Sequence, residues 1–213
     1  MEGSVYQYYA NVQTEPVEWL WYPYIPLGKL TVLQGDPGEG KSTFALNVVA
    51  RITTGQPMPD GVPAKGKRVA IYQCAEDGIA DTIKPRLQQA GADCERVAYI
   101  IDNDIALTLE DGRIETAIKD THASVFIIDP IQAFIPPDAD MQSATKMRSV
   151  PGCATATPSA FGSAIAQHAA KDAGIAAGGR GGHLKLRLES RGVPLDAIWF
   201  SNDGSGLDLE PGS

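Results

Sequence analysis

The sequence lacks a long hydrophobic run, a charged leader and a surplus of basic residues. No apolar stretch among its 213 residues approaches the roughly 20 that span a bilayer, so we expect no integral membrane protein. Residues 1–16 have neither a basic start nor an apolar core, which argues against a secretory signal. The net charge of −8 disfavours a protein that coats duplex DNA, although a local basic groove remains compatible with it.

Cysteine is also scarce. Cys74, Cys94 and Cys153 are scattered and odd in number, so they form neither a disulfide framework nor a CxxC metal site. This usage predicts reduced thiols in a cytoplasmic protein. The chain is 43% hydrophobic and 21% charged, which excludes a mostly disordered protein. Its length fits one domain of ordinary size.

Composition divides the chain into four parts. Residues 1–28 are rich in aromatics and prolines, which indicates an irregular arm packed on a core; stacking on a base is the alternative. Residues 29–150 form the expected core. Residues 151–182 are mostly Ala, Gly, Ser, Thr and Pro, whose burial offers little to offset the entropy of ordering, so we expect a poorly specified segment. Residues 183–213 predict a β-hairpin and tail.

Hydrophobic periodicity within the core predicts strands that alternate with helices. The expected strands cover residues 30–34, 68–72, 97–101 and 125–128, and the last is apolar throughout, as in a strand buried on both faces. The expected helices cover 44–50, ending near Gly55, then a stripe from Ile79 to Gly91, and residues around 114–118. Pro85 predicts a kink in that stripe or a later start. The pattern is typical of an α/β fold with a mainly parallel sheet.

One segment matches the phosphate-binding pattern GxxxxGK[ST] in full and lies between an expected strand and an expected helix. It comprises Gly35, Asp36, Pro37, Gly38, Glu39, Gly40, Lys41, Ser42 and Thr43. Glycines allow such a loop to turn its backbone N–H groups toward phosphate oxygens. We expect Lys41 to reach the β- and γ-phosphates of ATP and the Ser42 hydroxyl to ligate Mg²⁺.

Acidic residues follow two of the expected strands. Asp129 ends the buried run from Val125, as the metal-binding carboxylate of a Walker B strand does. Glu76 and Asp77 follow the second strand, where a carboxylate can orient and deprotonate an attacking water. Position alone leaves a solvated helix-capping turn as an equal alternative for this pair.

The order of these motifs resembles the RecA-like ATPases, and more closely the AAA-labelled branch around the RepA-type hexameric replicative helicases. The resemblance covers about residues 17–150, and its motifs are WLW at 19–21, PLGKLTVL at 26–33, QCAED at 73–77, IKPRL at 83–87 and IDPIQAF at 128–134. It implies that Glu76 is the catalytic base and Asp129 the metal carboxylate. It also implies a homo-oligomeric ring that hydrolyses ATP with Mg²⁺ and acts on single-stranded DNA.

The chain departs from that pattern after residue 150. His168 and Lys171 keep the spacing of the family's polar sensor, but the strand before them is weak and an unrelated surface histidine is the more favoured interpretation. Candidates for an arginine that reaches a neighbouring site are Arg180, Arg187 and Arg191, by location only. The tail from Gly182 to Phe200 is similar to a hairpin in the OB-like domain of RecJ-type exonucleases, but no nuclease metal motif accompanies it.

These observations favour a Mg²⁺-dependent, RecA-like ATPase connected with DNA replication or repair, in which motor action rests on the resemblance alone. The alternative is a nucleotide-binding switch, or a truncated or fused remnant, with little hydrolysis. The missing sensor and finger favour that alternative, whereas Glu76 and Asp129 oppose it. A small-molecule kinase also uses a phosphate loop, but no lid or acceptor site accompanies it here.

Overall fold

The structure, a computed structural model, describes residues 5–35, 38–102, 104–135 and the strands 163–169, 183–190, 193–194, 198–202 and 207–210. Three α-helices are present in the described residues: α1 (Lys41–Thr54), α2 (Lys84–Gln89) and α3 (Gly112–Thr121). The strands are β1 (Trp19–Trp21), β2 (Ile25–Pro26), β3 (Leu30–Gly35), β4 (Ala70–Cys74), β5 (Val97–Ala98), β6 (Val125–Asp129), β7 (Ser163–Ala169), β8 (His183–Ser190), β9 (Val193–Pro194), β10 (Ile198–Asn202) and β11 (Leu207–Glu210).

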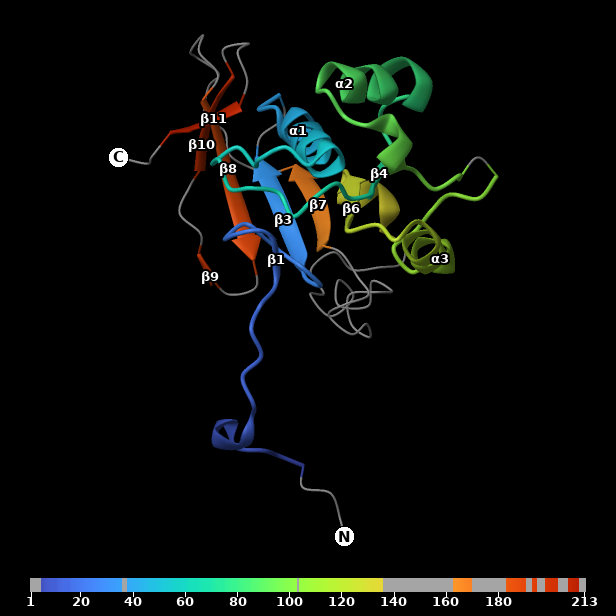
Figure 1. The fold of residues 1–213 in the computed structure, drawn as a ribbon. Helices are drawn as coiled ribbons and strands as arrows, with labels where there is room; N and C mark the ends of the chain where they lie inside the picture. Colours follow the sequence, from blue (N-terminus) through green and yellow to red (C-terminus); the bar gives the residue numbers. More distant parts are fainter. Residues whose placement is uncertain are drawn as a thin grey trace.

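The main sheet has the strand order β11-β10-β8-β3-β7-β6-β4-β5, with β9 paired to β8 (Figure 1). The five strands from β3 to β5 in this order are parallel to one another. β8 pairs antiparallel with β3, and β10 pairs antiparallel with β8. The α/β fold with a mainly parallel sheet and a C-terminal antiparallel hairpin is therefore confirmed.

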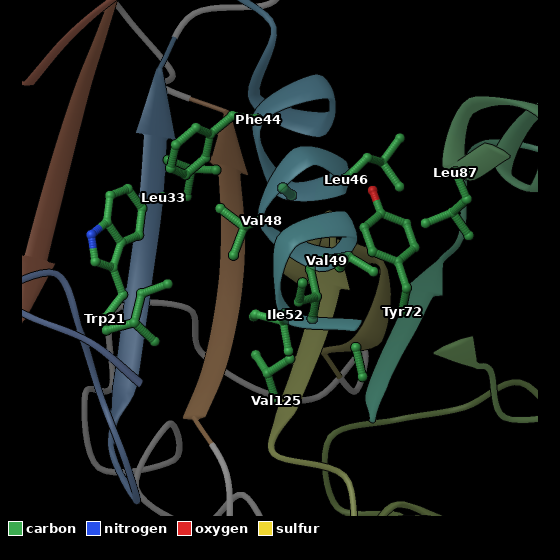
Figure 2. Close-up of a cluster of buried hydrophobic side chains, with 14 of the residues drawn as sticks. Trp21, Leu33, Phe44, Leu46, Val48, Val49, Ile52, Tyr72, Leu87 and Val125 are labelled. Atoms are coloured by element: carbon green, nitrogen blue, oxygen red, sulfur yellow. The ribbon is translucent and has the colours of Figure 1, made fainter. Parts of the chain in front are cut away.

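Two hydrophobic clusters cover the two faces of this sheet. Because side chains alternate along a strand, Val125 and Ile127 pack on the face of α1, whereas Phe126 and Ile128 pack on the opposite face with α3. Figure 2 shows the α1 cluster, in which Val48, Val49 and Ile52 lie against the strands. The same alternation places Asp129, the last residue of β6, on the face that α1 covers.

The helix boundaries follow the expected signals. α1 ends at Gly55, whose φ of 74° is the left-handed C-cap conformation that favours glycine. The stripe from Ile79 begins as a π-helical turn, η2 (Ile79–Ile83), and continues as α2, with Pro85 in its first turn. Pro85 therefore marks the later start of the α-helix, since a proline in the first turn forfeits no helical hydrogen bond.

The strand β7 was missed. It lies within the segment 151–182, for which the composition predicts little order, and it occupies a central place between β3 and β6. Strands on both sides supply hydrogen bonds for its backbone, so this strand needs less from its own side chains than an edge strand does. The rest of 151–182 lies outside the described residues, and so does Cys153.

The N-terminal arm only partly packs on the core. Trp21 and Ile25 are buried, and the Trp21 indole N–H donates a 2.8 Å hydrogen bond to Asp60 Oδ2. Residues 5–18 instead lead away from the body of the protein (Figure 1), with Tyr6, Tyr8 and Tyr9 exposed by 72%, 69% and 94%. The expectation of a packed arm is therefore correct near Trp21 and wrong for the described residues before Trp19.

Candidate active site

The predicted phosphate loop connects β3 to the first residue of α1. Gly38 and Gly40 have φ values of 85° and 84°, in the left-handed region that only glycine adopts readily. Gly40 is the N-cap of α1, and its carbonyl accepts a 2.8 Å hydrogen bond from the N–H of Phe44. Lys41 and Ser42 are the first two residues of this 14-residue helix. Asp36 and Pro37 lie outside the described residues.

This junction has the chemistry of an anion site. The first N–H groups of a helix have no acceptor within it, and the helix dipole is positive at that end. Lys41 adds a formal charge at the same place. A strand, a glycine turn and a helix that begins with Lys and Ser together suit the phosphates of a nucleotide.

Asp129 closes β6 at the carboxyl edge of the sheet. All five residues of this strand are buried, and Asp129 is 8% exposed. It lies two residues beyond Ile127 and therefore on the face that α1 covers. Its Oδ2 accepts a 2.8 Å hydrogen bond from the Tyr72 hydroxyl, and its backbone carbonyl accepts one of 3.1 Å from the N–H of Ala75.

Burial and the charge of Asp129 both raise the pKa of the Tyr72 phenol, burial contributing more. Tyr72 is therefore neutral at physiological pH and acts as the donor in this contact. Among the described residues, no basic side chain forms an ion pair with Asp129. A buried carboxylate without a cationic partner from this part of the chain fits a divalent cation, and the Ser42 hydroxyl offers a second oxygen ligand of the kind that Mg²⁺ prefers.

Glu76 and Asp77 follow β4 and have different surroundings. Cys74, the last residue of β4, lies opposite Asp129 in the parallel register, so the turn after it begins beside the end of β6. Asp77 forms a 2.8 Å ion pair with Arg86 of α2, and its N–H donates to Cys74 Sγ at 3.4 Å. Glu76 is exposed. The Asp77 carboxylate is thus engaged with α2, which leaves Glu76 as the better candidate for a base.

The Cys74 thiol at the start of this turn is partly buried. Burial raises the pKa of its thiol, and the backbone N–H groups of Asp77 and Glu76 partly oppose that shift. The thiol is therefore protonated at neutral pH. Cys74 also lines a pocket of about 240 Å³ between β4, β5 and α2, together with Cys94 and Tyr99. Cys74 and Cys94 are both free thiols.

The candidates beyond residue 150 are placed only in part. His168 lies near the carboxyl end of β7, opposite Gln34 of β3, and so at the edge where the phosphate loop begins. Arg187 lies opposite Gln34 on the other side, in β8. Lys171, Arg180 and Arg191 lie outside the described residues. The sensor and finger assignments therefore stay predictions.

The sequence analysis missed the roles of two polar residues of β4. Tyr72 contacts Asp129 at the candidate site, whereas the buried Gln73 side chain bonds the segment after β5 and holds it to the sheet. The available signal was a pair of polar side chains at adjacent positions of an otherwise apolar strand, one for each face of the sheet. A polar group in such a strand requires a partner.

Comparisons with known proteins identify a family and several relatives that resemble this chain. The AAA domain family (AAA_25) matches residues 7–174. The DNA repair protein RadA of Mycolicibacterium smegmatis is 30% identical over 131 residues, which cover 61% of this chain and 24% of that protein. RadA of Mycobacterium tuberculosis H37Rv is 30% identical over 155 residues, which cover 70% of this chain and 28% of that protein. The chain thus spans about a quarter of the length of these curated relatives.

Among solved structures, a KaiC-like protein from the archaeon Pyrococcus horikoshii OT3 has the same fold. The TM-score is 0.56, and the alignment covers 92% of this chain and all of that one. At 14% identity this similarity concerns the fold alone. Among the described residues, no helix is long and apolar enough to cross a membrane.

Proposed function

The chain belongs to the AAA domain family and has a RecA-like P-loop fold, and from this premise we propose that it binds ATP with Mg²⁺ and hydrolyses it. One observation carries the proposal. The glycine loop before Lys41, the buried carboxylate of Asp129 and the exposed carboxylate of Glu76 all lie at or just beyond the carboxyl ends of parallel strands, where ligands bind in open α/β sheets.

Each residue has a distinct role in this proposal. The N–H groups of the loop and the Lys41 ammonium bind the β- and γ-phosphates, which positions the γ-phosphate for in-line attack. Ser42 and Asp129 would hold Mg²⁺, which neutralises charge on the phosphate oxygens when it is bound. Glu76 orients the attacking water and accepts its proton, since its carboxylate is exposed and not engaged by Arg86.

Substitutions of Lys41, Glu76 and Asp77 test the proposal. Lys41→Ala should abolish tight ATP binding by calorimetry while the fold stays intact, and Lys67→Ala, an exposed lysine outside the loop, should leave the affinity unchanged. Glu76→Gln should retain binding and lose hydrolysis, because the amide cannot accept a proton. Asp77→Asn should have the smaller effect. The roles are wrong if Asp77→Asn stops turnover and Glu76→Gln does not.

The relatives named RadA support a further part of the proposal, namely that the ATPase works on DNA during repair or replication. Turnover measured with and without single-stranded DNA tests this part. Stimulation favours a DNA-coupled ATPase, whereas slow turnover with and without DNA favours the nucleotide-binding switch. A ring in the presence of ATP and Mg²⁺, the RepA-type helicase activity and a cytoplasmic location stay predictions, and sedimentation with and without nucleotide tests the ring.

A further inference from the structure

Among the described residues, Tyr72 donates a hydrogen bond to the Asp129 carboxylate, and the proposed ATPase reaction gives Tyr72 no role of its own. It lies on β4, in register with Ile127 of the neighbouring strand β6, two residues before the Cys74–Asp129 pair. Its ring therefore lies one step below the carboxylate on the same face of the sheet, and its hydroxyl reaches Oδ2 at 2.8 Å.

Packing fixes the direction of the Tyr72 ring. The side chain is 3% exposed and belongs to the cluster beneath α1, where Leu46 and Leu87 flank it (Figure 2). One part of the side chain lines the pocket of about 240 Å³ between β4, β5 and α2. The contacts with Leu46 and Leu87 still leave the ring few alternative rotamers, so the hydroxyl is held at the carboxylate before any ligand binds. The contact belongs to the folded protein itself.

The hydrogen bond distinguishes the two oxygens of Asp129. Oδ2 accepts from the phenol, and Oδ1 is left as the oxygen that can turn toward a cation. Rotation of the carboxylate would break a buried hydrogen bond to a charged acceptor, which is among the stronger neutral-donor contacts in proteins. A neutral hydroxyl also leaves the negative charge of Asp129 available, unlike a lysine or arginine partner.

We propose that Tyr72 is a positioning residue for the metal site: its hydroxyl holds Asp129 in the orientation that binds the divalent cation of the bound nucleotide. The inference rests on the proposed function, because it assigns the cation to Asp129. It adds a residue that acts through Asp129 without touching phosphate or metal. The loss of its hydroxyl should therefore weaken cation binding and spare binding of the nucleotide alone.

The test uses Tyr72→Phe, which removes one oxygen and keeps the ring, with Tyr99→Phe as control. Tyr99 lines the same 240 Å³ pocket as Tyr72, is 48% exposed and has no hydrogen bond to Asp129 among the described contacts. Binding of Mn²⁺ to the complex with a non-hydrolysable ATP analogue is measured by electron paramagnetic resonance. Tyr72→Phe should raise the Mn²⁺ dissociation constant about three- to tenfold, whereas Tyr99→Phe should not change it. Analogue affinity without metal should stay the same in both.

The Asp129→Ala variant tests whether Tyr72 affects Mn²⁺ affinity through Asp129. In Asp129→Ala the carboxylate is gone, so adding Tyr72→Phe should cause no further loss of Mn²⁺ affinity. Wild type, Tyr72→Phe, Asp129→Ala and the double variant are also unfolded thermally without nucleotide or metal. Tyr72→Phe should lower Tm more when Asp129 is present than when it is replaced by alanine. This cycle detects the contact independently of any ligand.

The outcomes separate the two proposals. If wild-type protein retains neither analogue nor Mn²⁺, the proposed function fails and the positioning role fails with it. If wild type binds both and Tyr72→Phe binds Mn²⁺ equally well, the proposed function stands and the positioning role is refuted, even where Tm falls. An equal loss of Mn²⁺ affinity in the Asp129→Ala background also refutes it, because the effect would then not pass through Asp129.

Discussion

Gln73→Met tests how the segment after β5 is attached to the sheet. The Gln73 side chain is 1% exposed and faces the main chain of Ile100, which is itself buried. Its Oε1 accepts from the Ile100 N–H at 2.9 Å, and its Nε2 donates to the Ile100 carbonyl and to Asp102 Oδ2, both at 3.3 Å. Methionine keeps the length of the side chain and removes all three bonds.

The expected loss follows from the groups left without partners. The N–H and carbonyl of Ile100 both lose a partner, and a buried polar group left unsatisfied costs about 1–3 kcal/mol. We take the lower part of that range, because the neighbouring Ile101 is 67% exposed and water can approach. Gln73→Met should therefore lower the free energy of unfolding by about 2–4 kcal/mol, or Tm by about 4–16 °C for a chain of this size.

Urea denaturation and amide hydrogen exchange measure this effect together. The Ile100 amide should exchange faster in Gln73→Met, while the amides of α1 should show only the global change. Gln88→Met on the exposed face of α2 is the control, and its free energy of unfolding should change by less than about 0.5 kcal/mol. A similarly small change in Gln73→Met, with Ile100 still protected, would refute the attachment by Gln73.

Three further substitutions probe other parts of the fold. Gly40→Ala should destabilise the protein by about 1–2 kcal/mol in urea, because the left-handed φ of 84° is costly for alanine while open space surrounds the added methyl group. Arg113→Met should remove the partner whose hydrogen bonds lower the pKa of Asp111 in the folded protein. A lowered folded-state pKa stabilises the protein above the unfolded value of 3.8, so the difference in free energy of unfolding between wild type and the variant should shrink as the pH falls below 3.8. A difference that does not change with pH would contradict this role. Ala166→Pro should prevent cooperative thermal unfolding or lower Tm sharply, since β7 is paired on both sides and proline cannot donate to either neighbour.

The sequence predicts the core of the fold where local signals agree with packing. The GxxxxGK[ST] segment combines a short β-rich run, a glycine turn and an apolar helix, and each of these has its own local cause. The apolar run that precedes Asp129 gives an equally clear signal, since four consecutive apolar residues suit a strand covered on both faces, and all five residues of β6 are buried. These two elements were enough to predict where the candidate site lies in the fold.

Other features depend on partners that are distant in sequence. Residues 97–101 have the pattern of a full strand, but only Val97 and Ala98 pair with β4, and beyond them the Gln73 side chain takes over the bonding. β7 has small residues and gains its place from β3 and β6. In the sequence Tyr72 looks like an ordinary strand residue, and its hydrogen bond to Asp129 is visible only once β4 and β6 are paired. Side-chain contacts between strands are absent from any one segment's pattern, so a single sequence cannot reveal them.

The position of β3 has a consequence for the order in which the protein can be completed during its synthesis. The strand before the phosphate loop is bordered by β7 and β8, whose partner residues come about 130 to 160 positions later in the chain. At about 5–20 residues per second, roughly 10–30 s of translation separate β3 from the end of β8. Throughout that interval both edges of β3 lack their final neighbours, and unpaired edges invite association with other chains. The nascent protein therefore emerges with the strand before the candidate phosphate loop unpaired, and we expect a chaperone-dependent phase that ends when β8 leaves the ribosome.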